Sequence, residues 1–150
     1  MPPGKCRVPH DQNAYVDPAL FSRAQEGLGA GFARTLGYFR EDGRRALIAI
    51  EEAMRAASAA ALVRPAHLLK GEALQFGARP LAELAEHIEE TARRCVEQQE
   101  SPTELLADVV RLRPLLEGTL ALFDRHAGPA TGRRPEFGRR MPIVPGYGQR

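Results

Sequence analysis

The sequence predicts an all-α protein, an up-down antiparallel four-helix bundle with a short extra helix at its N-terminal end. The middle of the 150-residue chain is rich in Ala, Leu, Arg and Glu, which favour helices over strands. Apolar residues recur at helical spacing in four long stretches of this region. The links between these stretches are short, so consecutive helices are expected to run antiparallel.

The first two helices are bounded by capping and turn residues. Asp17-Pro18 is a typical helix start, because the carboxylate can cap the first turn and proline suits the first helical position. This short helix should end near residues 27–31, where glycines cluster. A long helix is expected from about residue 31 to residue 57, with apolar residues at helical spacing.

Three further helices follow the same logic. Ser58 can cap a third helix, which Gly77 should end. A fourth helix is expected to begin at Pro80. Ser101, followed by Pro102 and Glu104, predicts the N-cap of a fifth helix that reaches about residue 126.

The chain thus divides into a flexible N-terminus (1–16), a helical bundle (17–126) and a Gly/Pro/Arg-rich tail (127–150). The tail contains five glycines and four prolines, which predict a disordered or docked segment. It also carries five arginines against one glutamate, which leaves sixteen basic and eighteen acidic residues in the rest of the chain. A slightly acidic body argues against nucleic-acid binding.

The composition also argues against a disulfide-rich, a metal-binding or a membrane protein. The two cysteines, Cys6 and Cys95, are too few and too far apart for a disulfide framework or a zinc cluster. No cofactor or metal site is expected in this chain. The apolar runs are too short to span a bilayer and the N-terminus lacks an apolar signal segment, so we expect a cytoplasmic protein without membrane contact.

The predicted third helix carries the residues that suggest chemistry. At about 100° per residue, Leu62, Ala66, Leu69, Ala73 and Phe76 form one core-facing stripe. His67 then points outward, with Lys70 and Gly71 one turn further along the same face. An exposed imidazole is a nitrogen nucleophile, and a lysine beside it offers positive charge to phosphoryl oxygens. Glycine costs about 1 kcal/mol in a mid-helix position, which makes sense if a partner must approach closely.

The stretch from His67 to Ala78, HLLKGEALQFGA, resembles the signature of histidine-containing phosphotransfer (HPt) domains. In that signature a histidine is followed by Lys at +3, Gly at +4, and Gly-Ala at +10 and +11. The resemblance covers about residues 17–126 and implies a four-helix bundle that relays phosphoryl groups between receiver-domain aspartates. It implies that His67 accepts the phosphoryl group through Nε2, Lys70 stabilises charge, and Gly71 gives clearance to the partner.

The resemblance also implies the partners, which are receiver domains of response regulators or hybrid histidine kinases, with Mg²⁺ held by the receiver. The chain has neither a Gly-rich phosphate loop nor room for an ATP-binding domain, so we expect a monomeric phosphocarrier without ATP-dependent kinase activity. The outward-facing Leu68 and Leu74 would give the docking surface an apolar component. Glu72 replaces the small residue that many members have and is expected to tune the docking rim.

Two details near His67 stay open in the sequence. Pro65 removes a backbone hydrogen bond two residues earlier and should kink or break the helix. On the fourth helix, Glu89 could reach the His67 ring and fix its tautomer. The alternative, which the polar run around it favours, is that Glu86, Glu89 and Glu90 form a solvated face.

Two other functions remain alternatives to the phosphocarrier. One is the phosphoacceptor and dimerisation helix pair of a sensor kinase, which would form a tight dimer. The other is a structural helical adaptor whose basic tail binds nucleic acid with steep salt dependence. If it is functional in a carrier, the same tail could instead steer acidic receiver surfaces.

Overall fold

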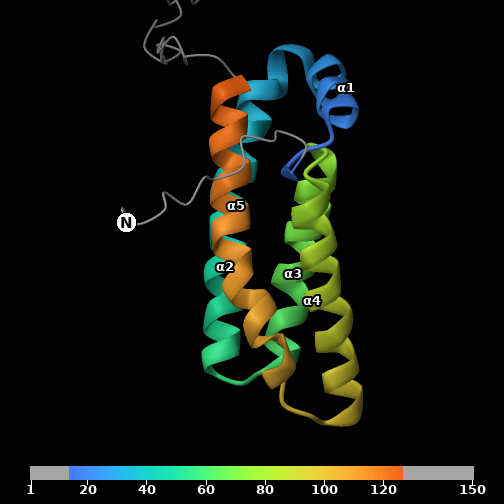
Figure 1. Ribbon diagram of the computed structural model, residues 1–150, viewed down its shortest axis with the longest axis vertical. Coiled ribbons are helices and arrows are strands. Elements are labelled where there is room, and N and C mark those ends of the chain that lie inside the picture. The colour runs from blue at the N-terminus through green and yellow to red at the C-terminus, as the bar shows by residue number, and fades with distance from the viewer. Residues whose placement is uncertain (1–13, 127–150) are drawn as a thin grey trace, which may run out of the picture.

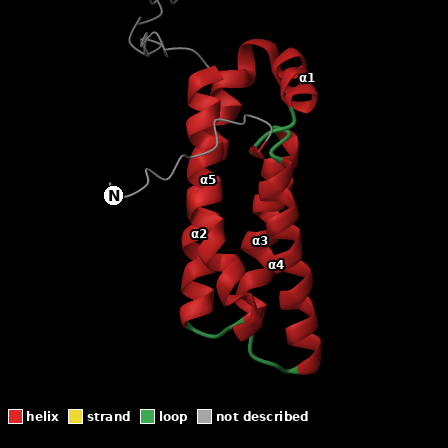
Figure 2. Cartoon of the chain, viewed as in Figure 1, coloured by secondary structure: helices red, strands yellow, loops and turns green. Residues whose placement is uncertain are grey.

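The computed structural model describes residues 14–126, and all regular structure within this range is helical (Figure 2). The five α-helices are α1 (Pro18–Leu28), α2 (Phe32–Arg55), α3 (Ala59–Gln75), α4 (Arg79–Gln98) and α5 (Leu106–His126). Short 3₁₀ turns, Gly29–Gly31 and Thr103–Leu105, precede α2 and α5. None of the helices in this range has the length and apolar character needed to cross a membrane.

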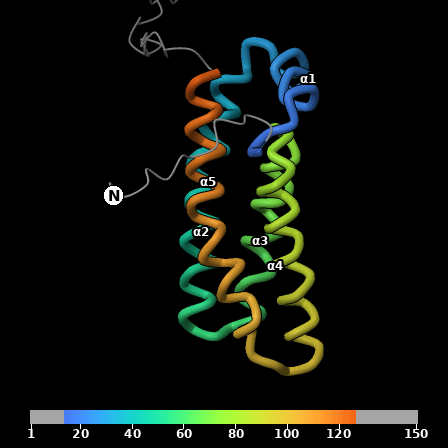
Figure 3. Tube along the Cα trace, viewed as in Figure 1, coloured from blue at the N-terminus to red at the C-terminus, as the bar shows by residue number. Residues whose placement is uncertain are grey.

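The four long helices form an antiparallel bundle, which confirms the predicted fold class. Each packs against its neighbours in the order α2, α3, α4 and α5, and α5 closes the ring against α2. In the view of Figure 1, α2 and α5 lie on one side and α3 and α4 on the other, while α1 lies across one end. The tube in Figure 3 shows the chain running up and down through these helices with short turns.

The core is the inward stripe of each helix, as the periodicity predicts. The α3 stripe is fully buried, with no solvent exposure at Leu62, Ala66, Leu69 and Ala73, nor at Phe76 directly after the helix. At the α1 end the core is aromatic, since the Phe21 ring stacks on Phe123 at 5.2 Å and meets Phe32 edge to face at 5.6 Å. Both arrangements are favourable for aromatic rings. Within residues 14–126, the α3 face opposite this stripe does not contribute to the core.

The start of α1 is joined to the α3–α4 turn. Asp17 caps α1 as predicted, its Oδ1 accepting hydrogen bonds from the backbone N–H groups of Ala19 (3.0 Å) and Leu20 (3.3 Å). The backbone N–H of Asp17 donates to the carbonyl of Gly77 at 2.8 Å. Gly77 has φ +72°, and a Cβ there would lie 2.7 Å from the Cβ of Leu20. Glycine is thus required where α3 ends, and this turn fixes how α4 lies against α3.

Two local predictions differ from the structure. Val16 is buried and Tyr15 packs against the core, so the folded part begins before the expected residue 17. The helix after residue 101 begins as a 3₁₀ turn at Thr103 without a side-chain cap, so the predicted Ser101 cap is wrong. Glu104 does not support that cap either, because its carboxylate pairs with Arg94 of α4.

Helix α3 continues without interruption through Pro65, so proline does not break it. The proline lies in the second turn, where it removes a single hydrogen bond, and the buried residues on either side keep the helix packed. The predicted flexibility of residues 1–13 and the disordered or docked tail at 127–150 lie outside the described residues.

Candidate functional site

His67 lies near the middle of α3, on the face opposite the buried stripe. Its side chain is 60% exposed, as the helical geometry predicts. The neighbours on the buried side, Ala66 and Leu69, have no solvent exposure and hold this turn of the helix against the core. The imidazole is therefore displayed by a rigid element.

Glu89 of α4 holds the His67 ring from behind. Nδ1 of His67 lies 2.9 Å from Oε1 of Glu89. The Glu89 side chain is only 6% exposed, so the solvated-face interpretation is wrong for this residue, although Glu86 and Glu90 are exposed. Within residues 14–126, Nε2 of His67 has no hydrogen-bond partner and is the nitrogen open to a visiting group.

Two cations compensate the buried carboxylate. Nζ of Lys70 lies 2.8 Å from Oε2 of Glu89, and a guanidinium nitrogen of Arg93 lies 2.9 Å from Oε1. Oε2 is otherwise without a partner among the described residues. Burial raises the pKa of Glu89, but the contacts with Lys70, Arg93 and His67 outweigh it and lower the pKa to about 2. The contact with Glu89 in turn raises the pKa of Lys70. Both groups are therefore charged at neutral pH.

Gly71 leaves a bare patch of helix one turn from His67. It is exposed, and a Cβ built on it would meet no atom of the described part of the chain within 4 Å. Nothing among residues 14–126 requires glycine there, which is consistent with a need for clearance toward a partner. The nearby apolar side chains Leu68 and Leu74 are 53% and 55% exposed, as predicted.

Glu72 lies apart from the imidazole. It is partly buried in a groove of about 450 Å³ between α2 and α3, together with Asp42, Pro65 and Leu68. Burial, and to a lesser degree the nearby Asp42, raises the pKa of Glu72. His67 does not line this groove, so Glu72 is separated from the acceptor nitrogen but borders the same outer face through Leu68.

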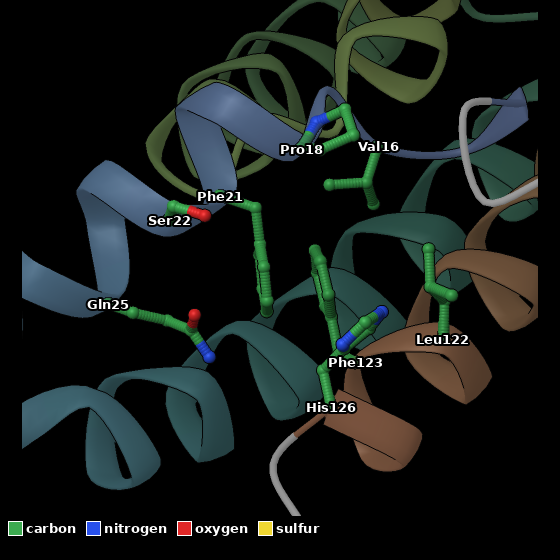
Figure 4. A pocket seen from close by; sticks show the side chains of 8 residues that line it. All are labelled: Val16, Pro18, Phe21, Ser22, Gln25, Leu122, Phe123 and His126. Atoms are coloured by element: carbon green, nitrogen blue, oxygen red, sulfur yellow. The ribbon is translucent and has the colours of Figure 1, made fainter.

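The remaining histidines and cavities offer less chemistry. His87 is 58% exposed, and its Nε2 lies 3.4 Å from Asp108. His126 borders a cavity of about 120 Å³ at the α1 end, where the rings of Phe21 and Phe123 face each other (Figure 4). No group of three or more His, Cys, Asp or Glu residues between residues 14 and 126 is arranged to hold a metal ion.

Sequence reasoning missed Arg93 and undervalued Glu89. Both belong to a polar run of α4, and a polar run of this kind predicts a solvent-facing surface. The available signal was position, because Glu89 lies four residues after Ala85 and three before Ala92, both buried. That places it beside the core stripe. Arg93 follows one turn later and is the natural partner of a carboxylate at that position.

The comparisons with known proteins agree with this geometry. The Hpt domain family matches residues 34–122. Among solved structures, the chain is similar to histidine-containing phosphotransfer protein B (HptB) from Pseudomonas aeruginosa PAO1, with 26% identity and a TM-score of 0.65. That match covers 75% of this chain and 93% of the other. A search of curated proteins found no match. The chain belongs to the Hpt domain family and is a histidine phosphotransfer intermediary of the phosphorelay type.

Proposed function

We propose that this protein accepts a phosphoryl group on Nε2 of His67 from a receiver-domain aspartate and passes it to another receiver. The observation that carries the proposal is that the His67 imidazole is bound at one nitrogen and, within the described residues, open at the other. Nδ1 of His67 is bound to a buried carboxylate, while the His67 side chain as a whole is 60% exposed. A ring held at one nitrogen and open at the other is oriented for attack by the open nitrogen.

The charges around the ring suit the transfer. Lys70 lies on the same helix face one turn away, and its ammonium sits at the Glu89 carboxylate beside the ring. An ammonium there can attract the phosphoryl oxygens as they arrive. Arg93, 56% exposed and bound to the same carboxylate, is a second cation at this edge.

The surface around the ring suits a protein partner. Leu68 and Leu74 supply exposed apolar contacts, Gly71 leaves room for the partner's active-site edge, and Glu72 borders the groove beside them. In this proposal the receiver supplies the acidic pocket and Mg²⁺, while the carrier supplies nucleophile and charge. The carrier itself needs no cofactor and does not take phosphate from ATP.

The four long helices close a bundle from one chain, which supports a monomeric carrier over the dimeric helix pair of a sensor kinase. Donor and acceptor receivers must share a compartment with the carrier, and we propose the cytoplasm. In this proposal the helical bundle performs the phosphoryl transfer. The basic tail contributes at most to association with acidic receivers.

The direct test follows radiolabel from a phosphorylated receiver panel onto the full chain. Wild type should become labelled, and the label should be stable in alkali and labile in acid, as phosphohistidine is. His67→Ala should lose the label, while His87→Ala, which removes a histidine of similar exposure, should keep it. Labelling of His67→Ala, or labelling of wild type by ATP alone, would contradict the proposal.

A further inference from the structure

The His67 ring is bonded to a group that can only accept hydrogen bonds. An ionised carboxylate has no hydrogen to donate, so a nitrogen that bonds to it must carry a proton. Glu89 is such a carboxylate, and its Oε1 lies 2.9 Å from Nδ1. Glu89 is also buried and held by two cations, so it cannot turn away into solvent.

We infer that Glu89 keeps a proton on Nδ1 of His67 throughout the phosphorylation cycle. The phosphorylated (loaded) ring is then an imidazolium, and it gives up its phosphoryl group (discharges) without any proton transfer. The inference rests on the proposed function, because it concerns the phosphorylated ring. It makes Glu89 a positioning residue whose charge, in addition to its shape, sets how the loaded ring reacts.

The atoms balance without an acid or a base. On loading, the Nε2 lone pair forms the N–P bond and the P–O bond to the donor aspartate breaks, its electron pair returning to the carboxylate. Nδ1 keeps its proton, so the ring becomes cationic beside the Glu89 anion. On discharge, the acceptor aspartate forms a new O–P bond and the N–P pair returns to Nε2. A neutral imidazole leaves, still donating from Nδ1 to Glu89.

The alternative state is unfavourable in this geometry. If the loaded ring lost its Nδ1 proton, two lone pairs would face each other across 2.9 Å, in a place where Glu89 is shielded from water. The leaving group would then be an imidazolate, which is a much poorer one. Glutamine at this position would remove the constraint, because its amide can present either an acceptor or a donor.

The other charged groups near the ring come from the two helices that form the site. Lys70 and Arg93 both contact Glu89, and Glu86 lies 3.8 Å from Lys70. On the α2 side, Asp42 and Arg45 line the groove that His67 does not line. Glu89 is thus the anion in contact with the ring. Since its pKa is about 2, it stays ionised at any pH where the protein would be tested.

The test uses the full chain in a background where His10, His87 and His126 are replaced by Gln, so that His67 is the histidine that remains. Potassium phosphoramidate serves as a phosphodonor that needs no partner protein. Wild-type Glu89, Glu89→Gln and the control Glu86→Gln are loaded, and the loaded ring is followed by ³¹P and ¹⁵N NMR across pH. The rate of phosphoryl loss is measured over the same range, and circular dichroism checks the fold.

With Glu89, the Nδ1–H signal should persist and the rate of loss should change less than about twofold from mildly acidic to mildly alkaline pH. In Glu89→Gln the ring should titrate within this range, and the rate should fall about tenfold per pH unit beyond the midpoint as the protonated fraction falls. Glu86→Gln should behave as the parent does. A phosphorylated parent ring that loses its Nδ1 proton within this pH range would overturn the inference, whether or not the Glu89→Gln variant folds. Failure of His67 to load from receivers would instead count against the proposed function.

Discussion

Two histidines, His67 on α3 and His87 on α4, have similar solvent exposure but differ in the carboxylate that contacts each ring. Their side chains are 60% and 58% exposed, and each lies near a carboxylate. The carboxylate behind His67 is buried, binds Nδ1 and is held by two cations. The one near His87, Asp108, is 21% exposed and lies 3.4 Å from Nε2, the nitrogen that His67 leaves open.

The comparison teaches that an exposed imidazole is not by itself a phosphoacceptor site. His67 has a fixed orientation, a lysine one turn away and a bare glycine on its face. His87 has Glu90 and Thr91 at the corresponding offsets, and its companion cation, Arg111, belongs to a pair on the surface of α5. Preorganisation on the buried side of the ring therefore distinguishes the two.

The largest effect is expected from filling the bare patch. Gly71→Gln should slow transfer from a receiver about a hundredfold, because its side chain would stand where the partner must approach. The matched control is Gly37→Gln on α2, where a Cβ likewise meets no atom of residues 14–126 within 4 Å. Both substitutions should raise the free energy of unfolding by up to about 1 kcal/mol, since helical glycine is unfavourable. Equal transfer rates in the two variants would show that clearance at Gly71 is irrelevant.

Removal of the lysine should have the next largest effect. Lys70→Ala takes away the ammonium that can make charge-assisted contacts with the phosphoryl oxygens, so transfer should slow about thirtyfold. Arg111→Ala removes the cation beside the His87 pair, at a contact of 3.4 Å to Asp108, and should leave the rate unchanged. Stopped-flow transfer from a phosphorylated receiver measures both. A similar loss in the two variants would point to general charge attraction and away from the site.

The buried carboxylate should also make stability depend on acid pH. Because its folded pKa of about 2 lies below the ordinary value of 4.5, Glu89 stabilises the fold above about pH 4.5 and loses this contribution as pH falls toward 2. Its cationic partner Arg93 is half exposed, so we expect only about 1 to 2 kcal/mol. Urea unfolding of wild type and Glu89→Gln at neutral and acid pH measures it. The same pH dependence in both proteins would contradict a stabilising role for the ionised Glu89.

The part of this site that belongs to one helix could be predicted from the sequence. Helical periodicity fixes the angles between Ala66, His67 and Gly71, so the outward ring and the bare patch beside it follow directly. The same periodicity predicted the four long helices, because each has one apolar stripe. Relative position within a helix depends only on local geometry.

The part that crosses between helices could not be predicted. Whether Glu89 faces His67 depends on the register of α4 against α3, and Gly77 sets this register through its positive φ and its contact with α1. The Ser101 cap failed for a similar reason, since Glu104 bonds to Arg94 of another helix and the chain enters α5 through a 3₁₀ turn. Contacts of this kind follow from packing, which the pattern of one helix does not contain.

The smallest expected effect concerns the His87 pair itself. Asp108 lies in the first turn of α5, where its negative charge interacts favourably with the helix dipole. It also has partly exposed contacts with His87 and Arg111. Asp108→Asn should therefore lower the free energy of unfolding by only about 0.5 kcal/mol at neutral pH and leave phosphoryl transfer unchanged. Thermal unfolding and the receiver assay measure the two. A transfer defect in this variant would mean that the α4–α5 face also takes part in docking, and the contrast between the two histidines would no longer hold.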